Sequence, residues 1–146
     1  MEDRHALIVD DTPANKVFFE RLLTQAGFTV QGASDGNTAM QLADNMPSLD
    51  LAVLDMEVPH MNGLEMTARL RQKFPDMCIV VATMHDEHSL MHSAFKRGCD
   101  VFMVKPHGFM TLFKQIANGG HLHLRAQRPQ IIDQFGIRTF RSAISQ

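Results

Sequence analysis

The chain has 146 residues, of which 45% are apolar, and a formal net charge of −2, values that suit one globular domain and argue against a disordered chain. Its uninterrupted apolar runs are only a few residues long, far short of the roughly 20 residues of a membrane-spanning helix, and its polar, acidic start lacks the features of a signal peptide. We therefore expect a soluble, cytoplasmic protein that has no membrane partner.

Short apolar runs alternate along the chain with longer stretches of helical periodicity. The predicted elements in chain order are strand 5–10, helix 13–26, strand 28–33, helix 37–46, strand 51–54, helix 64–74, strand 78–82, helix 86–97, strand 101–104 and helix 108–118. Thr12 and Pro13 favour the start of the first helix, because threonine caps helices and proline suits the first helical position. Gly27 and Gly98 each follow a helix as a stop signal. Strands that alternate with helices of this length predict βαβ units, and five of them fit a doubly wound α/β sandwich around a parallel sheet.

Polar side chains follow the apolar cores of four predicted strands. They are Asp10 and Asp11 after the first strand, Asp55 after the third, Thr83 after the fourth and Lys105 after the fifth. The carboxyl ends of parallel strands share one edge of a sheet, and ligands bind there. Three carboxylates in one cleft repel one another unless a cation compensates them, and Mg²⁺ prefers carboxylates, waters and phosphate oxygens. A nearby lysine and hydroxyl would stabilise a phosphoryl group, and a carboxylate can itself attack phosphorus.

The stretches around these side chains carry a family resemblance. They are Leu7–Asp11, Leu54–Gly63, Val80–Thr83 and Val104–Pro106. Found in this order and at this spacing, they make residues 4–118 resemble the receiver domains of two-component response regulators, which are CheY-like. The resemblance implies a flavodoxin-like α/β fold with a five-stranded parallel sheet in the order 2-1-3-4-5, five helices and, here, a C-terminal extension. X–Pro bonds are seldom cis in folded proteins, but the resemblance favours a cis bond between Lys105 and Pro106.

The resemblance also implies a role for each polar side chain. Asp55 would accept a phosphoryl group from a sensor histidine kinase or a phosphotransfer protein. Mg²⁺ would be bound directly by Asp11 and Asp55, through water by Asp10, and by the backbone carbonyl of Glu57. Thr83 and Lys105 would hold the phosphoryl oxygens.

Switching in this family pairs the threonine with an aromatic residue three positions before the lysine, which is Phe102 here. When the Thr83 hydroxyl moves toward the phosphoryl group, the ring of Phe102 would turn into the vacated space. The output face would consist of residues 86–98, 101–104 and 108–118, and would contact a downstream protein partner or a fused output domain.

Three residues near the predicted site depart from the common pattern or flank it. Met84 is bulky where relatives usually carry a small side chain, so it could narrow access to Asp55. Glu57 and His85 occupy positions that tune the phosphoryl lifetime in the family. An acid at position 57 could repel a phosphodonor or orient a water molecule, and the sequence leaves both alternatives open.

Histidines and cysteines give weaker signals. His85, His88 and His92 could share one helix face and bind a transition metal, but a solvated or partner-facing surface is favoured because no supporting carboxylate shell is evident beyond their immediate neighbours. Cys78 and Cys99 lie in apolar contexts and are expected to be buried thiols rather than a disulfide.

Residues 119–146 exceed what the predicted fold needs, and we treat them as an extension separate from a receiver domain at 1–118. Their apolar side chains are too many for a solvated tail; these are Ile131, Ile132, Phe135, Ile137, Phe140 and Ile144. We expect one or two helices over 130–144, broken near Gly136, that dock on the same domain or on a second copy as a homodimer. The extension holds four arginines, but the body is mildly acidic, so direct nucleic-acid binding is not expected.

An enzyme is the alternative functional class. A Mg²⁺-dependent aspartyl-phosphate phosphohydrolase also uses an aspartate nucleophile, but the haloacid-dehalogenase type has a second aspartate two residues later and a threonine two residues beyond that. Glu57 and Pro59 occupy those positions. A phosphoacceptor signalling domain, with at most self-phosphorylation and self-dephosphorylation activity, is therefore favoured.

Overall fold

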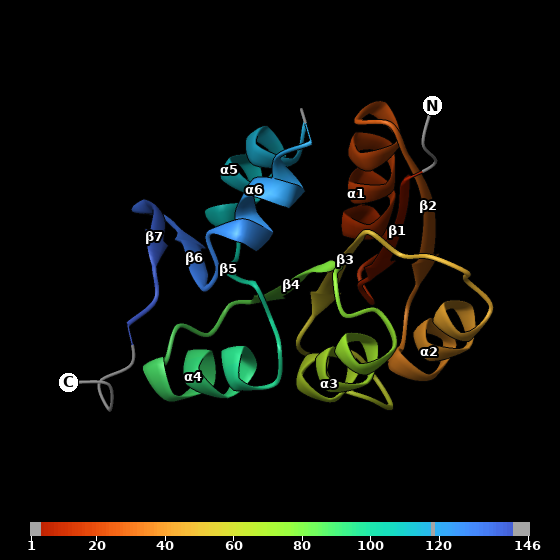
Figure 1. Ribbon diagram of the computed structural model, residues 1–146, viewed down its shortest axis with the longest axis horizontal. Helices are drawn as coiled ribbons and strands as arrows, with labels where there is room; N and C mark the ends of the chain where they lie inside the picture. The colour runs from red at the N-terminus through yellow and green to blue at the C-terminus, as the bar shows by residue number, and fades with distance from the viewer. Residues whose placement is uncertain (1–3, 118, 142–146) are drawn as a thin grey trace.

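A central β-sheet with helices on both faces forms the framework of the chain (Figure 1). The computed structural model describes residues 4–117 and 119–141. The elements run in the order β1 (Arg4–Val9), α1 (Pro13–Gln25), β2 (Phe28–Ala33), α2 (Gly36–Asp44), β3 (Leu51–Asp55), α3 (Gly63–Lys73), β4 (Cys78–Thr83), α4 (His88–Lys96), β5 (Val101–Val104), α5 (Gly108–Ile116), α6 (Gly120–Ala126), β6 (Gln130–Asp133) and β7 (Gly136–Thr139). Helices α1, α5 and α6 cover one face of the sheet, and α2, α3 and α4 cover the other (Figure 1).

The sheet has seven strands in the order β2-β1-β3-β4-β5-β6-β7. Strands β1 to β6 pair in parallel, and β7 pairs with β6 in the antiparallel direction. The predicted flavodoxin-like α/β fold and the order 2-1-3-4-5 are therefore confirmed. The expected five strands and five helices are too few, since the described part of the chain adds α6, β6 and β7.

The prediction of helices over 130–144 is wrong for residues 130–141, the part of that range that the structure describes. Residues 130–133 form β6, which is buried along its whole length. Ile131 and Ile132 point into opposite faces of the sheet, and each joins a different hydrophobic cluster. A strand buried on both faces lacks polar alternation, so its sequence resembles a buried helix. Ile144 lies outside the described residues.

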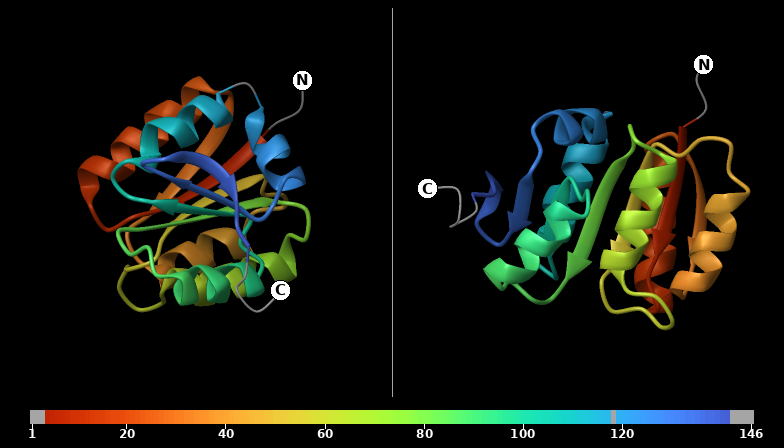
Figure 2. Two further views of the ribbon diagram at one scale, coloured as in Figure 1. Left: turned by 90° about the vertical axis from the view of Figure 1, so that its left-hand side faces the viewer. Right: turned by 60° about the horizontal axis from the view of Figure 1, so that its bottom comes forward.

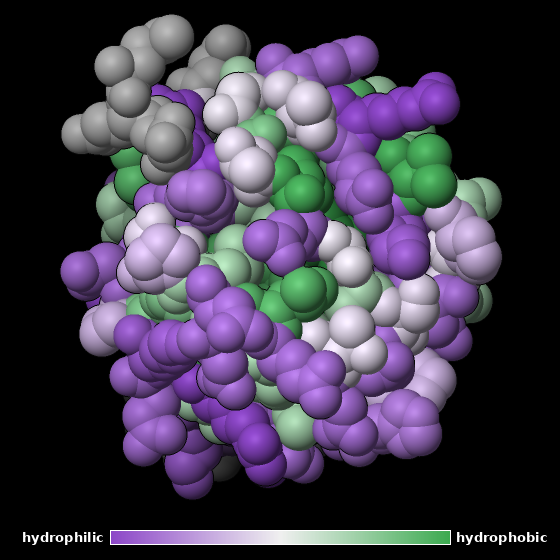
Figure 3. Space-filling view, turned by 90° about the vertical axis from the view of Figure 1, so that its right-hand side faces the viewer, coloured by the Kyte–Doolittle hydropathy of each residue, from purple (hydrophilic) through white to green (hydrophobic). Residues whose placement is uncertain are grey.

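The β6–β7 hairpin extends the sheet beyond β5, between α5 and α4 (Figure 2). The extension thus packs on its own domain, which is one of the two arrangements that its apolar side chains allow. The other edge of the sheet is β2. The surface on that side of the molecule is mixed, with hydrophilic side chains surrounding smaller hydrophobic areas (Figure 3).

Apolar side chains from the inner strands fill both faces of the sheet. Leu7 and Leu54 belong to the cluster beneath α2, α3 and α4, whereas Ile8 and Val80 belong to the cluster beneath α1 and α5. All four are fully buried, and burying a side chain of this size contributes about 1.5–3 kcal/mol. This packing fixes the strand register and hence the positions of the residues that follow each strand.

Both cysteines are buried, free thiols, as expected. Burial raises the pKa of the Cys78 and Cys99 thiols well above the usual range. Both side chains are therefore uncharged at neutral pH and act as small apolar groups within the core.

A buried carboxylate joins the extension to the body of the domain. Asp100, which precedes β5, is fully buried and accepts hydrogen bonds from Arg71 of α3 at 2.6 Å, from Arg125 of α6 at 2.8 Å and from the Ile79 backbone N–H at 2.9 Å. A buried charge needs such partners. Helix α6 is therefore anchored at the edge of the sheet where the strands begin, opposite the predicted site.

Candidate functional site at the carboxyl edge of the sheet

Three carboxylates meet where β1 and β3 end. Val9 pairs with Leu54 in the sheet, so Asp10 and Asp55, which follow them, lie on neighbouring strands at one edge. Ligand atoms of Asp10, Asp11 and Asp55 all lie within 4.8 Å of one another. Asp10 and Asp55 are about 95% buried, whereas Asp11 is exposed. The predicted convergence of these side chains is therefore seen in the fold.

The electrostatics of this acidic cluster favour a cation. Burial raises the pKa of Asp10, the nearby charge of Asp55 raises it further, and a hydrogen bond from the Thr12 backbone N–H at 2.9 Å opposes the shift. Like charges held this close are costly unless a cation compensates them. An all-oxygen set with one exposed member, open to solvent and substrate, fits Mg²⁺, which keeps waters and binds phosphate oxygens.

Two donors hold the carboxylate of Asp55. Lys105 Nζ lies 3.3 Å from Asp55 Oδ2, and both side chains are largely buried. The backbone N–H of Glu57 donates to Asp55 Oδ1 at 3.2 Å. The Lys105–Pro106 bond is cis, as expected. A positive charge therefore lies directly beside the Asp55 carboxylate.

The hydroxyl of Thr83 is engaged by a carboxylate that follows the neighbouring strand. Thr83 is fully buried, and its Oγ1 donates to Glu57 Oε1 at 2.8 Å while it accepts from the His85 backbone N–H at 3.2 Å. The imidazole of His85 lies between Glu57 Oε1 at 3.5 Å and Glu87 Oε1 at 3.7 Å. Sequence reasoning named Glu57 and His85 separately but missed their contact. The available signal was their spacing, since each lies two residues beyond the end of one of two adjacent strands.

The remaining predicted residues lie around this pocket. Phe102 is fully buried beneath α4, and its ring centroid lies 6.4 Å from that of Phe95. Met84 is 72% exposed at the surface next to Thr83. Its effect on access to Asp55 stays a prediction, as does the switching role of Phe102.

The histidine group does not form a second metal site in the residues that the structure describes. There, the acidic cluster is the one set of three or more ligating side chains close enough for a metal ion. The ring of His88 instead stacks on Phe140 at 4.7 Å, and His88 Nε2 donates to the backbone carbonyl of Arg141 at 2.9 Å. His88 thus packs on the chain's own C-terminal segment, an arrangement that the sequence did not predict.

A family model described as the response regulator receiver domain matches residues 6–117. The chain belongs to this family. This receiver domain is 34% identical over 118 residues to the nitrate/nitrite response regulator protein NarL of Escherichia coli, a match that covers 77% of this chain and 54% of NarL. The chain spans about half or less of the length of the first curated relatives it matches.

Solved structures of receiver domains superpose on this one. The chemotaxis response regulator CheY4 of Vibrio cholerae is 25% identical with a TM-score of 0.71, over 79% of this chain and 97% of CheY4. A response regulator protein from Burkholderia pseudomallei has a TM-score of 0.71 at 23% identity, over 85% of this chain and 72% of that one, and its structure holds a phosphorylated aspartic acid, a calcium ion and citrate. Receiver domains are signalling domains. Separately, none of the helices that the structure describes is long and apolar enough to cross a membrane.

Proposed function

We propose that this receiver domain accepts a phosphoryl group on Asp55, with Mg²⁺ as cofactor, from a sensor histidine kinase or a phosphotransfer protein. The observation that carries the proposal is the position of the Asp55 carboxylate, which lies 3.3 Å from the Lys105 ammonium on one side and within 4.8 Å of ligand atoms of Asp10 and Asp11 on the other. One carboxylate is thus placed beside both a fixed cation and a metal-binding pair.

The transfer is a displacement at phosphorus. A carboxylate oxygen of Asp55 attacks the phosphorus of a phosphohistidine, the P–O bond of an acyl phosphate forms, and the P–N bond breaks with its electron pair leaving on the imidazole nitrogen, which takes up a proton. The Lys105 ammonium neutralises charge on the transferred oxygens. The Thr83 hydroxyl would donate to one of these oxygens after leaving Glu57.

The acidic side chains would hold the metal. In this proposal Asp11 and Asp55 bind Mg²⁺ directly, Asp10 binds it through water, and the backbone carbonyl of Glu57 supplies a further ligand. The bound ion supplies positive charge that offsets the carboxylates and the incoming phosphoryl group. We place this reaction in the cytoplasm, where a kinase has its ATP.

The output of the domain would be a protein contact made by the chain itself or by a fused output domain. We propose a receiver unit at 1–118 and an associated extension at 119–146, and we propose homodimerisation as a use of the extension. The phosphohydrolase alternative is not favoured, since Glu57 and Pro59 do not match the pattern that it needs.

Intact-mass measurement after incubation with acetyl phosphate and Mg²⁺ tests the proposal. The wild type should gain the mass of one phosphoryl group, with acetate as the leaving group, and Asp55→Asn should gain none. The matched control is Asp76→Asn, which changes an exposed aspartate away from the site and should behave as the wild type does. An adduct that forms equally in Asp55→Asn, or a wild type that remains unmodified, contradicts the proposal.

A further inference from the structure

The loop between β4 and α4 connects the candidate site to the first turn of a helix. Residues 84–87 follow Thr83 directly and lead into α4 at His88. At its site end the loop is held by Glu57, whose carboxylate accepts from the Thr83 hydroxyl at 2.8 Å and lies 3.5 Å from the His85 imidazole. Glu57 thus contacts both the residue before this loop and the loop itself.

The far end of the loop is held by the C-terminal segment of the same chain. The N-cap residue of α4, Glu87, makes no side-chain cap hydrogen bond. His88, the first residue of α4, instead contacts residues 140–141, because its ring stacks on Phe140 and its Nε2 donates to the carbonyl of Arg141. Phe140 is 8% exposed. Segment 140–141 thus holds the side chain of His88, the first residue of α4, while Glu87 gives the backbone N–H groups of that turn no side-chain cap.

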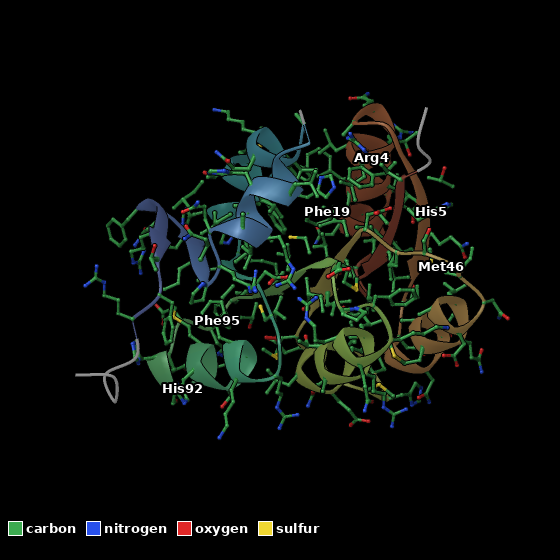
Figure 4. All side chains as sticks on the ribbon, viewed as in Figure 1. Arg4, His5, Phe19, Met46, His92 and Phe95 are labelled. Atoms are coloured by element: carbon green, nitrogen blue, oxygen red, sulfur yellow. The ribbon has the colours of Figure 1, made fainter. Side chains whose placement is uncertain are left out.

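A chain of aromatic ring contacts also joins the same segment to the interior of the domain. The ring centroid of Phe140 lies 4.8 Å from that of Phe95, which lies 6.4 Å from that of Phe102 on β5. Figure 4 places Phe95 on the side of α4 that faces the sheet and the β6–β7 hairpin. Because protein interiors are closely packed, displacement of either neighbour of Phe95 changes how Phe140 can pack.

The hairpin and segment 140–141 also cover part of the surface that the family resemblance assigns to output. Strand β6 pairs with β5 along residues 101–103, and Phe140 beyond the hairpin then packs against His88 and Phe95 of α4. The docked position of segment 140–141 therefore decides whether the aromatic surface around Phe95 is available to another molecule.

We propose that segment 140–141 is an intramolecular ligand of α4 whose docking is coupled to the acidic pocket, so that phosphorylation of Asp55 releases it; this inference rests on the proposed function. A phosphoryl group adds a charge of about −1.5 to −2 within reach of the Glu57 carboxylate and competes with it for the Thr83 hydroxyl. The Thr83–Glu57 hydrogen bond breaks, Glu57 and the loop that holds His85 shift away from the pocket, and the first turn of α4 loses its alignment with segment 140–141.

The absence of tryptophan and tyrosine from the sequence makes a direct experiment possible. Phe140→Trp introduces the single tryptophan of the chain beside His88, so its emission reports burial of segment 140–141. Addition of beryllium trifluoride, a phosphoryl mimic, with Mg²⁺ should shift that emission to longer wavelength as the indole becomes exposed. The matched control, Phe18→Trp, lies on α1 across the sheet and should show no shift.

Thermodynamic linkage supplies a second measurement that needs no tryptophan. If phosphorylation weakens the docking of the segment by a given factor, removal of the docking contact must tighten the binding of a phosphoryl mimic by up to the same factor. Phe140→Ala should therefore bind beryllium trifluoride more tightly than the wild type in calorimetry, by about 100-fold, toward the upper end of the usual range for coupled sites, because a weaker coupling would leave a segment anchored by a buried phenylalanine docked. Glu57→Gln, which keeps a hydrogen-bond acceptor but removes the charge, should reduce the emission shift of Phe140→Trp at saturating mimic.

The outcomes separate the two proposals. If the mimic binds only when Asp55 is present, but the emission of Phe140→Trp does not change and Phe140→Ala binds with wild-type affinity, the coupling is refuted while the phosphoacceptor function stands. If neither the mimic nor acetyl phosphate modifies the wild type, the proposed function itself fails. Circular dichroism of each variant verifies folding, and the affinity measurement on Phe140→Ala decides the matter if Phe140→Trp does not fold.

Discussion

Replacing Asp10 with asparagine removes one of three carboxylates at the sheet edge and keeps the side-chain oxygen that accepts from Thr12. We expect Asp10→Asn to be more stable than the wild type when no divalent cation is present. The reason is electrostatic, since the wild type holds a largely buried carboxylate within 4.8 Å of two others.

The size of the effect follows from the distances. At an effective dielectric constant of about 20, two unit charges at the upper limit of these separations, 4.8 Å, repel each other by about 3.5 kcal/mol. Lys105, 3.3 Å from Asp55, offsets part of this repulsion, and solvent screens the exposed Asp11. We therefore expect a net gain of about 1 kcal/mol, which corresponds to roughly 2–4 °C in Tm for a chain of this size.

The gain should depend on pH with a defined sign. Burial, reinforced by Asp55, raises the pKa of Asp10 above its usual value of 3.8, so the folded protein binds this proton more tightly than the unfolded chain does. The stabilisation from protonated Asp10 is complete below the usual pKa and is lost as pH rises through the raised value. Asparagine does not titrate, so the advantage of Asp10→Asn appears as pH rises through that window and disappears below it.

Urea unfolding in EDTA, and again with Mg²⁺, provides the assay. At a Mg²⁺ concentration ten times its Kd, the wild type should gain about 1.4 kcal/mol, whereas Asp10→Asn should gain less because a ligand of the proposed site is changed. The difference in unfolding free energy between the two proteins should thus narrow or change sign when the metal is added. A variant less stable than the wild type in EDTA at neutral pH, or an equal gain from Mg²⁺ in both, would refute the reasoning; Asp76→Asn is the control for an exposed aspartate.

Three further predictions concern the ammonium, the buried ion pair and the C-terminal segment. Lys105→Met should slow phosphorylation by acetyl phosphate about 100-fold, as followed by intact mass, and an unchanged rate would remove the role of the ammonium. Arg125→Ala should lower the free energy of unfolding in urea by about 1–3 kcal/mol, since it withdraws one partner of the buried Asp100 carboxylate; no loss would mean that Asp100 is satisfied without α6. Phe140→Ala should lower the free energy of unfolding by about 3 kcal/mol. Phe135→Ala, at an 81% exposed position, should change it by less than about 0.5 kcal/mol. Equal losses in the two variants would contradict the burial of Phe140.

The position of the site was accessible from sequence because it depends on where strands end rather than on how side chains pack. Each apolar run fixes a buried strand, parallel pairing brings the strand ends to one edge, and Asp10, Asp55 and Lys105 follow those runs directly. The family resemblance added the roles, which no pattern of spacing supplies. The fold class and the meeting of the acidic side chains could therefore be predicted from the residues, whereas the strand order came from the resemblance.

The contacts that depend on side-chain direction were not accessible in this way. Glu57 is half exposed, and nothing in its local sequence indicates that it accepts from the Thr83 hydroxyl at 2.8 Å rather than pointing into solvent. The contact exists because β3 and β4 are neighbours, which makes the residues beyond their ends neighbours too. A prediction would have needed the register of the two strands and the rotamers at both positions.

The extension was misjudged because its pattern is ambiguous. Ile131 and Ile132 are consecutive apolar residues that serve two faces of the sheet, and a short run of this kind fits a buried helix as well as a buried strand. Gly136, with a φ of 102° at the start of β7, was correctly identified as a break, but it begins the second strand of a hairpin instead of separating two helices.

Strand β6 also bears on which molecules this receiver domain can recognise. Because the hydrogen-bonding edge of β5 is already occupied within the chain, an effector shaped to grip a bare fifth strand meets a steric obstacle. Discrimination of this kind needs no repulsive charge, because it depends only on the pairing of β6 with β5.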